Sequence, residues 1–454
     1  MRHRLAAWLL AGVVAATVFI VSPVTSAWGD SALTVPTALS LSRTGSLSLS
    51  PHEGSPLLDH YAAWEFDGEI INAFPWTVAI FAVPVVVAND VLATVGIGQP
   101  TSSLVQAADT WGLEKITAAL LSAATAMLIA ELVFQRLTGR TDRWRVGWGL
   151  VAAALFAFGT SAWSTASRSL WQHGPSILLI TIALLLATRL AERGRNAPDD
   201  RITAVLTVAL GVITALSYTV RPTNAIIVVL FAWWSWRRRI LGWYLAAVAS
   251  TTAVWALYNV TQGIGAVPFY YRSNRIGLHA EFPEALAANL FSSGRGLLVF
   301  SPFVIMTLLV ISRRFDHRNG DGLELLSGVA IASMWIAVSL FPHWWAGHSY
   351  GPRFMADTTA FIMVLLVPVF AFITDGITTG ASGSRRNSAR ALVGILAALG
   401  AWSTVAHGQG AWFEATHCWN RVPHDVDDAP ERIWSLSDPQ LTSGLRSIRL
   451  ERPC

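Results

Sequence analysis

The chain has 454 residues, of which 53% are hydrophobic and only 13% are charged, and its formal net charge is +4. Soluble globular domains usually carry about 25% charged residues, so this composition excludes an ordinary soluble protein and indicates an integral membrane protein. The basic excess does not indicate a nucleic-acid partner, because most arginines lie in short links beside apolar runs. Basic residues at such places set membrane topology.

Apolar runs recur along the whole chain and are separated by polar links. At roughly 17–25 residues each, they can cross a hydrocarbon core of about 30 Å as helices that satisfy their own backbone. In chain order the runs lie near 5–27, 74–95, 113–135, 147–165, 174–190, 202–219, 222–236, 240–259, 295–312, 323–341, 355–374 and 391–408. The alternating ten-residue segments of a membrane β-barrel are absent. The pattern therefore predicts an all-α polytopic membrane protein.

The arginines indicate which of these runs cross the membrane. If every run crossed, the link RLTGRTDRWR (136–145) would lie outside, against the positive-inside rule. The run 74–95 contains two prolines, an Asn and an Asp, so we expect it to lie at the interface or to re-enter. About 11 transmembrane helices then remain, and 19 of the 31 arginines fall on the cytoplasmic side. We predict a plasma-membrane protein with its N-terminus inside and its C-terminus outside.

The first apolar run has two interpretations. RHR precedes it and VTSAWG ends it, which is also the pattern of a cleaved secretory signal. A run of about 20 residues is long for a signal peptide, and this favours an uncleaved first span. Under either interpretation the chain from residue 30 onward is expected to be extracytoplasmic until the next crossing.

The long links all fall on the outer side in this topology. They are 28–112, 260–294, 342–354 and the tail from 409 onward, so we expect functional residues outside. We divide the chain into a transmembrane domain, 1–409, with its first extracytoplasmic loop at 28–112, and an extracytoplasmic tail, 410–454. Cys418 and Cys454 both lie in the tail, where a disulfide is permitted but is not decided by spacing.

The outer links concentrate ionisable and aromatic residues. Asp30 directly follows the first run, and the acidic segment YAAWEFDGEIINAFPW comes later in the same loop. The other outer candidates are His173 in SLWQHGP, Arg221 in RPTN, Arg272 and Arg275 in FYYRSNRIG, Arg295 in SSGRGLLVFSP, and His343, His348, Tyr350 and Arg353 in FPHWWAGHSYGPRFMAD. Ionisable groups near a membrane persist when they are paired or functional. Arginine matches phosphate oxygens, so a carboxylate surrounded by Arg and His suits group transfer from a lipid phosphate.

Several common site motifs are absent. The sequence contains no CxxC, HExxH, Walker A or GxGxxG element. ATP-driven transport, zinc proteolysis and dinucleotide chemistry therefore have no support in the sequence.

Six segments, in order over about residues 20–375, carry a family resemblance. They are GDSALTVPTALSLSRTGSLSLS, DGEIINAFPW, SLWQHGP, RPTN, SSGRGLLVFSP and WWAGHSYGPRFM. Together they resemble the multi-pass glycosyltransferases of the GT-C superfamily, of the protein-mannosyl, aminoarabinose and arabinofuranosyl transferase type. The tail string WNRVPHDVDDAPERIWSLSDPQ also resembles the ends of some bacterial members. The resemblance implies a polyprenyl-phosphate sugar donor, a first outer loop with interfacial helices, and an essential acid in that loop.

The resemblance also assigns roles to residues. Asp30 matches the first-loop acid and would act as general base on an acceptor hydroxyl, with Asp67 as a second catalytic candidate. The donors to the departing phosphate would be Arg353, Arg221, Arg275 and His343, and the further substrate-binding candidates are Arg272, His348, Glu69, Tyr350, Arg295 and His173. Many members pair two acids in the first loop, whereas Ser31 follows Asp30 here. A divalent cation would need Asp67 or Glu69 to fold back, so no metal site is assigned.

Two other classes of protein stay open on the sequence alone. A transporter or flippase for a lipid-linked or anionic solute should carry ionisable groups at mid-span, but here Glu131 is the main charged exception among Ser and Thr. A noncatalytic assembly protein gives no reason for arginines to gather outside. Each candidate also has a structural interpretation, as a helix cap, an interfacial anchor or a turn residue. The expected partners are membrane lipid, the donor and an acceptor glycan, lipid or protein, with no nucleic acid.

Overall fold

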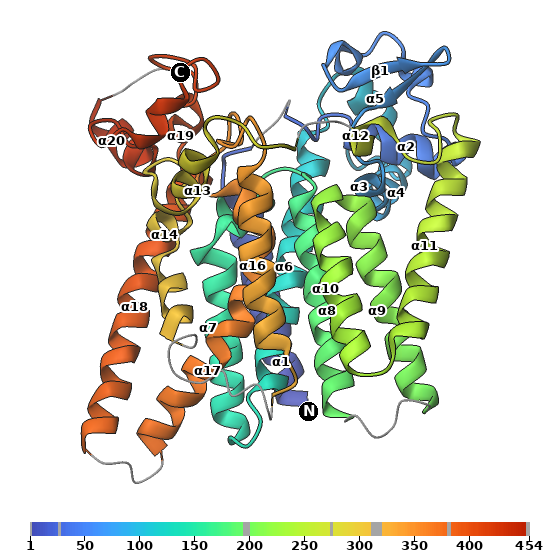
Figure 1. The fold of residues 1–454 in the computed structure, drawn as a ribbon. Helices are drawn as coiled ribbons and strands as arrows, with labels where there is room; N and C mark the ends of the chain where they lie inside the picture. Colours follow the sequence, from blue (N-terminus) through green and yellow to red (C-terminus); the bar gives the residue numbers. More distant parts are fainter. Residues whose placement is uncertain are drawn as a thin grey trace.

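The computed structural model describes residues 2–25, 29–193, 200–272, 276–309, 320–378 and 383–450. Long helices lie side by side in one bundle, and two groups of short elements cover one end of it (Figure 1). Within the described ranges, seven helices are long and apolar enough to cross a membrane. They are α1 (Arg2–Val21), α6 (Trp111–Arg136), α8 (His173–Glu192), α9 (Arg201–Val220), α11 (Leu241–Thr261), α17 (Thr359–Thr378, continuing the 3-10 turn Arg353–Thr358) and α18 (Gly383–Trp412).

The remaining predicted spans are helical too, but shorter or more charged. They are α7 (Asp142–Gly159), α10 (Ala225–Arg237), α16 (Leu323–Ser339), and α14 (Leu297–Phe300) with the 3-10 turn Pro302–Thr307 after it. These elements run alongside the seven longer helices in the bundle (Figure 1). The predicted all-α polytopic class is therefore confirmed in outline, whereas the count of 11 crossings stays a prediction.

Small residues allow the helices to pack closely. On α6 the buried face toward α1, α7 and α8 is rich in alanine, including Ala123, Ala126 and Ala130. A Cβ atom at Gly149 of α7 would lie 2.8 Å from the carbonyl oxygen of Ala130. Small side chains at such crossings let backbones approach, as is usual where lipid replaces water as the solvent.

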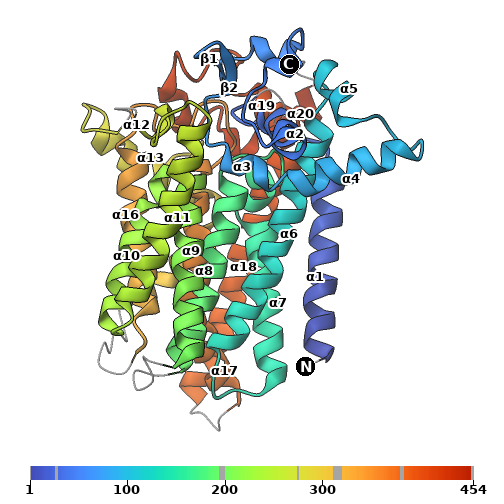
Figure 2. The ribbon, with the colours of Figure 1, turned by 90° about the vertical axis from the view of Figure 1, so that its right-hand side faces the viewer.

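The run 74–95 does not form a spanning helix. It folds as α3 (Thr77–Ile80) and α4 (Val83–Thr94), with Pro84 in the first turn of α4. Figure 2 shows α4 lying across the end of the bundle and projecting beyond α6. The rest of the first outer loop includes α2 (Thr34–Thr44) and α5 (Thr101–Gln106), which pack with α4 around a separate hydrophobic core.

The first outer loop also contains a β-hairpin that the sequence analysis did not anticipate. Strands β1 (Ala63–Phe66) and β2 (Glu69–Asn72) pair antiparallel, with Phe66 opposite Glu69. Asp67 and Gly68 form the turn, with φ values of +49° and +79°. Two successive positive φ values are those of a type I′ turn, for which Asp-Gly is a preferred sequence.

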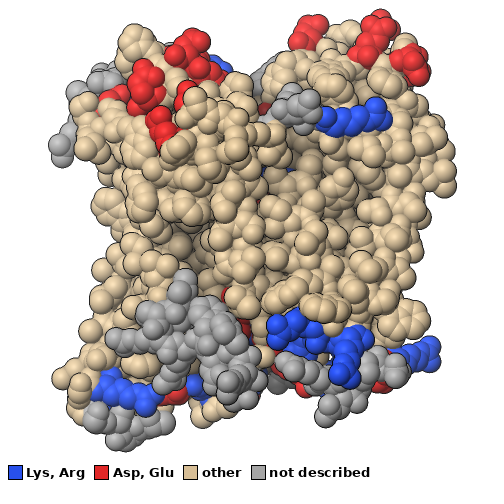
Figure 3. Space-filling model, in the orientation of Figure 1, with Lys and Arg blue, Asp and Glu red and all other residues tan. Residues whose placement is uncertain are grey.

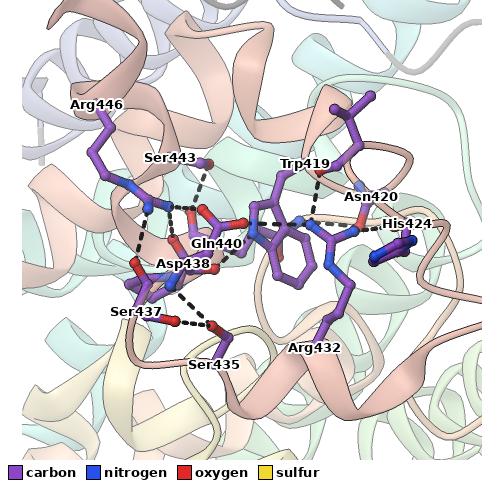
Figure 4. A network of polar contacts seen from close by, with 12 residues as sticks. Trp419, Asn420, His424, Arg432, Ser435, Ser437, Asp438, Gln440, Ser443 and Arg446 are labelled. Carbon is purple, nitrogen blue, oxygen red and sulfur yellow. Dashed lines mark hydrogen bonds and ion pairs between the residues drawn. The ribbon is translucent and has the colours of Figure 1, made fainter. Parts of the chain in front are cut away.

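The C-terminal residues form a cap over the outer ends of α14 and α18. The cap contains α19 (Ala415–Cys418), the 3-10 turns Pro430–Trp434 and Gln440–Thr442, and α20 (Ser443–Leu450), and it sits beside α13 (Phe282–Phe291) (Figure 1). Arg446 and Arg432 both pair with Asp438, at 2.7 and 3.5 Å, and Trp419 Nε1 donates to the Asp438 carbonyl oxygen (Figure 4). Cys418 is disulfide-bonded, whereas Cys454 lies outside the described residues.

Charge is divided between the two ends of the bundle. On the face drawn in Figure 3, most visible Lys and Arg lie at the end where the N-terminus is found, and most visible Asp and Glu lie at the opposite end. The hairpin, α4 and the C-terminal cap all belong to that second, acidic end (Figures 1 and 2). We call it the outer end, following the predicted topology.

Candidate active site

The Asp30 carboxylate lies in the loop after α1 and joins two distant parts of the chain. Its Oδ1 accepts a hydrogen bond from the Tyr61 hydroxyl at 2.5 Å, and its Oδ2 accepts one from Nη2 of Arg353. The Arg353 guanidinium in turn lies 3.7 Å above the ring centroid of Trp171. The side chain of Asp30 is about a third exposed, at 35%, so the carboxylate is still reachable.

The contacts of Asp30 decide its protonation. Burial alone would raise the pKa of the Asp30 carboxyl, but the charge of Arg353 and the hydrogen bonds from Tyr61 and Arg353 bring that pKa below its ordinary value. Burial and the neighbouring Asp30 charge raise the pKa of the Tyr61 phenol. At neutral pH the pair is therefore an ionised carboxylate beside a protonated hydroxyl.

A second cluster lies close to Asp30 and is almost fully buried. Asp357 Oδ2 is 2.9 Å from His173 Nδ1 and 2.8 Å from Nη1 of Arg221. Arg221 also donates from Nε to the Thr223 hydroxyl at 2.9 Å. An electrostatic interaction with His173 is among the causes of the lowered pKa of Asp30, so the two clusters lie within electrostatic reach of each other.

Buried polar groups hold the loop that carries Asp30. The Ser31 hydroxyl donates to the Glu114 carboxylate at 2.6 Å, and Ser169 donates to the same oxygen at 2.9 Å. The Lys115 ammonium donates to the Ser22 carbonyl oxygen at 2.6 Å, and so does Arg168, at 3.0 Å. The start of α6 therefore holds Ser22 and Ser31, which precede and follow Asp30 in the chain.

Three buried polar atoms at this site have no hydrogen-bond partner among the described residues. They are Nε of Arg353, Nε1 of Trp171 and Oδ1 of Asp357. Buried polar atoms are nearly always paired, so a group of unpaired ones suggests room for a polar ligand or water. Two of the three belong to the cation–aromatic pair that faces Asp30.

The segment 341–357, which the sequence analysis treated as one site, divides in the structure. Arg353 reaches Asp30, but the Tyr350 hydroxyl is buried and donates to the Ala406 carbonyl oxygen at 2.7 Å. His348 pairs with Asp425 of the C-terminal cap at 2.7 Å, and the exposed His343 packs against Trp345. Of its four predicted site residues, only Arg353 lies in the Asp30 cluster.

The remaining predicted residues are also spread out. Arg295 is buried and its guanidinium donates within the cap region, to the carbonyl oxygens of Trp345 (2.5 Å) and Gly347 (2.9 Å) and to the Asn420 side chain at 3.1 Å. Arg272 is exposed at the end of the short helix α12 (Phe269–Arg272). Arg275 lies outside the described residues.

The two carboxylates of the hairpin, Asp67 and Glu69, have local structural roles. Asp67 is exposed at the turn, where its positive φ makes it a turn residue. Glu69 accepts hydrogen bonds from the Ser48 hydroxyl and, at 2.8 Å, from the Ser50 hydroxyl. Within the described part of the chain, no recorded contact brings either carboxylate to Asp30, so the folding back that a metal would require is not observed.

A divalent cation does not fit the Asp30 cluster. The immediate neighbours of the carboxylate are a phenol and an arginine, and among the described contacts of Asp30 there is no second acidic ligand. A set with suitable ligand types lies elsewhere: ligand atoms of His348, Asp425 and Asp427 all fall within 4.8 Å of one another. Trp345 Nε1 already donates to Asp427 there, at 2.6 Å.

Sequence reasoning missed several residues of the site. Tyr61 gave no signal, because nothing in YAAWEF marks that tyrosine. Asp357 was visible as an acid at the start of an apolar run, in RFMAD, but was not chosen. Trp171 was visible in SLWQHGP, two residues before His173. Each of these is brought to the site by long-range packing.

Comparison with known proteins gives the fold. A scan against protein-family models finds no match, and a search of curated proteins finds none either. A solved structure of the archaeal oligosaccharyltransferase AglB from Archaeoglobus fulgidus, in complex with an inhibitory peptide and a dolichol-phosphate, is similar over 96% of this chain, with a TM-score of 0.51 and 13% sequence identity. The chain covers 60% of the length of that protein. The likeness supports a GT-C-like membrane fold.

Proposed function

We propose that this chain is a membrane glycosyltransferase that moves a sugar from a polyprenyl-phosphate donor to an acceptor hydroxyl on the extracytoplasmic face. The observation that carries the proposal is the Asp30 cluster. A reachable carboxylate shares contacts with an arginine, and a second buried arginine and a histidine lie beside it at the outer end of a GT-C-like bundle.

Asp30 supplies the base in this proposal. It takes the proton from the acceptor hydroxyl while that oxygen forms a bond to the anomeric carbon of the donor sugar. The bond between that carbon and the phosphate oxygen breaks, and polyprenyl phosphate leaves with the electron pair. Since the Arg353 contact lowers the pKa of Asp30, a donor phosphate that draws Arg353 away would make the carboxylate a stronger base.

Arg353 and Arg221 bind the donor phosphate in this scheme. Guanidinium groups present paired N–H donors that match phosphate oxygens and stabilise the charge that develops on the leaving group. The unpaired Nε of Arg353 is a free donor for this task. Asp357 and His173 hold Arg221 in place, and the remaining sequence candidates stay outside this core set.

The proposed topology has eleven crossings, with the N-terminus inside and both the C-terminus and the Asp30 cluster outside. The separation of basic and acidic residues between the ends of the bundle supports this orientation (Figure 3). The dolichol-phosphate bound to the similar archaeal protein supports a lipid-linked donor. The division into a transmembrane domain, 1–409, and a tail, 410–454, belongs to the same proposal.

Sugar transfer in proteoliposomes tests the proposal. The purified protein is offered polyprenyl-phosphate donors of mannose, arabinofuranose, galactose and aminoarabinose with glycan, lipid and peptide acceptors. We expect one donor to be used, and we expect Asp30→Asn to lower kcat by about 10²–10⁴-fold, as for loss of a general base. Asp109→Asn, at an exposed position of the same loop, is the matched control and should retain full activity.

The opposite result would change the class of protein. The catalytic assignment fails if no donor is used. It also fails if the folded Asp30→Asn variant transfers sugar as fast as the wild type does. A transporter for a lipid-linked or anionic solute, or a noncatalytic assembly protein, would then come first. Substrate-dependent transport in the same vesicles distinguishes these two alternatives.

A further inference from the structure

An aromatic cleft lies at the outer end beside the Asp30 cluster. The hairpin and the segment after it line one side of the cleft, and the segment that follows α11 lines the other. Figure 1 shows the hairpin and α12 at the same end of the bundle. We define the aromatic cleft by its rings, which are Trp64, Phe66, Phe74, Trp76, Phe269, Tyr270 and Tyr271. The space between the walls amounts to about 600 Å³, including the part that is open to solvent.

The rings of the aromatic cleft face one another across the two walls. Trp64 and Phe269 have ring centroids 4.6 Å apart, and Phe74 and Tyr270 are 5.3 Å apart. The pairs do not cover each other fully, because Phe269 is 54% exposed and Phe66 is 43% exposed. Exposed rings gathered in one hollow, beyond the ends of the spans, usually mark a binding site.

The aromatic cleft leads to one particular oxygen of Asp30. A second hollow shares Trp64, Phe74, Phe269 and Tyr270 with the cleft and adds Tyr61. The Tyr61 hydroxyl is bonded to Oδ1 of Asp30, whereas Arg353 is bonded to Oδ2. A molecule in the cleft therefore approaches the carboxylate from the oxygen that the phosphate-binding arginine does not hold.

The floor of the aromatic cleft lies at the last turns of two spans. Trp76 Nε1 donates to the Asn259 side chain, in the last turn of α11, at 2.8 Å. The Tyr271 hydroxyl donates to the carbonyl oxygen of Thr219, one residue before the end of α9. The cleft is thus on the aqueous side of these helix ends, and a lipid tail entering it would leave the hydrocarbon core.

The chemistry of the lining favours a neutral ring. Among the described residues, those that line the cleft carry no charged side chain, and their polar groups are those of Thr37, Asn72, the phenols and the indoles. A sugar ring presents flat C–H faces that pack on aromatic rings and a few hydroxyls that need hydrogen bonds. A peptide would need partners for its backbone amides, and this lining offers few.

We propose that the aromatic cleft binds the acceptor and that the acceptor is a neutral saccharide, whose terminal ring packs on the exposed aromatic rings of the cleft and turns one hydroxyl toward Oδ1 of Asp30. This inference rests on the proposed function and names its acceptor class. In the reaction, the proton of that hydroxyl passes to Asp30 as its oxygen bonds to the anomeric carbon. The sugar–phosphate bond breaks and the phosphate departs on the Arg353 side.

Binding without turnover tests the aromatic cleft by itself. The full chain in nanodiscs, without donor, is titrated with neutral trisaccharides of mannose, galactose and arabinofuranose, with a serine-containing hexapeptide, and with geranylgeranyl phosphate. Tryptophan fluorescence and saturation-transfer NMR report binding. We expect one trisaccharide to bind, and we expect Phe269→Ala and Trp64→Ala to weaken its binding about tenfold or more, since each removes an aromatic ring on which the saccharide packs.

Controls separate binding from folding and from catalysis. Phe291→Ala removes an exposed ring, 58% accessible, that lies outside the cleft, and should bind as the wild type does. Trp64→Phe keeps a ring and should restore most of the affinity that Trp64→Ala loses. Asp30→Asn should retain saccharide binding although it loses turnover.

Several results would overturn the inference. If geranylgeranyl phosphate binds and Phe269→Ala abolishes that binding, the cleft is a lipid-tail site. If the peptide binds and the same variant abolishes its binding, the acceptor is a protein. The inference is also wrong if none of the three trisaccharides binds, or if Phe269→Ala and Trp64→Ala both bind the saccharide as tightly as the wild type does. Saccharide binding without transfer from any donor would reject the proposed function but leave the cleft assignment standing.

Discussion

The contact between Asp30 and Arg353 predicts a change in pH dependence when the arginine is removed. The pKa of Asp30 lies below its ordinary value, so the carboxylate is ionised at neutral pH and protonates only as pH falls through that lowered value. Arg353→Gln removes the charge that lowers the pKa and leaves the burial that raises it. The acid limb of kcat/KM should therefore move to higher pH.

A pH–rate profile of wild type and Arg353→Gln in the same proteoliposomes measures this shift. The position of the limb is independent of the lower absolute rate that loss of a phosphate-binding group would cause. The same linkage applies to folding, since the lowered pKa adds stability above the unfolded-state pKa, and this is lost as pH falls through the folded-state value. If the acid limb of kcat/KM lies at the same pH in both proteins, a group other than Asp30 controls the rate.

The buried pair of Asp357 and Arg221 predicts a stability effect that depends on both partners. Asp357 is 1% exposed and Arg221 is 8% exposed, so removing one charge leaves the other uncompensated. Asp357→Asn should cost about 3–5 kcal/mol of folding free energy, the usual cost of breaking a buried pair from one side. The double variant Asp357→Asn/Arg221→Gln should regain part of that loss.

This prediction is tested by measuring thermal unfolding midpoints in detergent for four proteins: the wild type, the two single variants and the double variant. A double variant as unstable as the sum of both singles would show that the two charges act independently.

At the scale of single residues, the sequence identified the charged half of the site better than its neutral half. Asp30, Arg353, Arg221 and His173 stood out as ionisable residues at the ends of apolar runs. Tyr61 could not be identified from the sequence, because its contact with Asp30 depends on how the first outer loop folds over the bundle. Aromatic residues are common at membrane interfaces, so composition does not separate a functional ring from an anchoring one.

Among the secondary-structure elements, α4 predicts a measurable depth in the bilayer. Its exposed side chains include Val87 at 46% and Val91 at 60%, and Asp90 ties it to α2 through Arg43 at 3.3 Å. A helix of 12 residues is about 18 Å long, too short to cross a core of about 30 Å. We therefore expect α4 to lie in the outer interface with its valines in contact with lipid.

Fluorescence quenching by lipids brominated at different depths measures that position. Val91→Cys carrying a bimane label should be quenched best by lipids brominated near the headgroup. Val254→Cys, at a position 69% exposed against 60% for Val91, lies in the middle part of α11 and is the deep reference position. Equal depths for the two labels would show that the segment re-enters the core instead.

The elements also show where periodicity stops being informative. Prolines and polar residues in 74–95 predicted that this run does not span the membrane, and in the structure it is divided into the short helices α3 and α4. The hairpin was not predicted, because helices were expected throughout the chain. Asp-Gly between the short segments AWEF and EIIN is nevertheless a good local signal for a hairpin turn. The aromatic cleft could not be predicted at all, since residues 64–76 and 264–271 meet only when the first and later outer links fold together.

For the whole molecule, apolar runs and arginine counts were enough to predict a polytopic helical bundle, because both follow from the membrane rather than from tertiary contacts. The number of crossings is harder to predict. α7 has 18 residues and α10 has 13, or about 27 and 20 Å of helix, and such lengths cross a bilayer only with help from neighbouring turns.

Labelling of single cysteines with a membrane-impermeant maleimide in intact cells decides the number of crossings. If α7 crosses, α8 returns the chain to the cytoplasm, and Arg201→Cys should label only after detergent is added. Labelling of the same cysteine without detergent would contradict the eleven crossings and also the placement of His173, the first residue of α8, at the outer end. Gln106→Cys lies in the first outer loop and is the positive control, while the unsubstituted chain gives the background from its own two cysteines. The excess of arginine in 189–201 leads us to expect protection of Arg201→Cys, since otherwise that basic link would face outward.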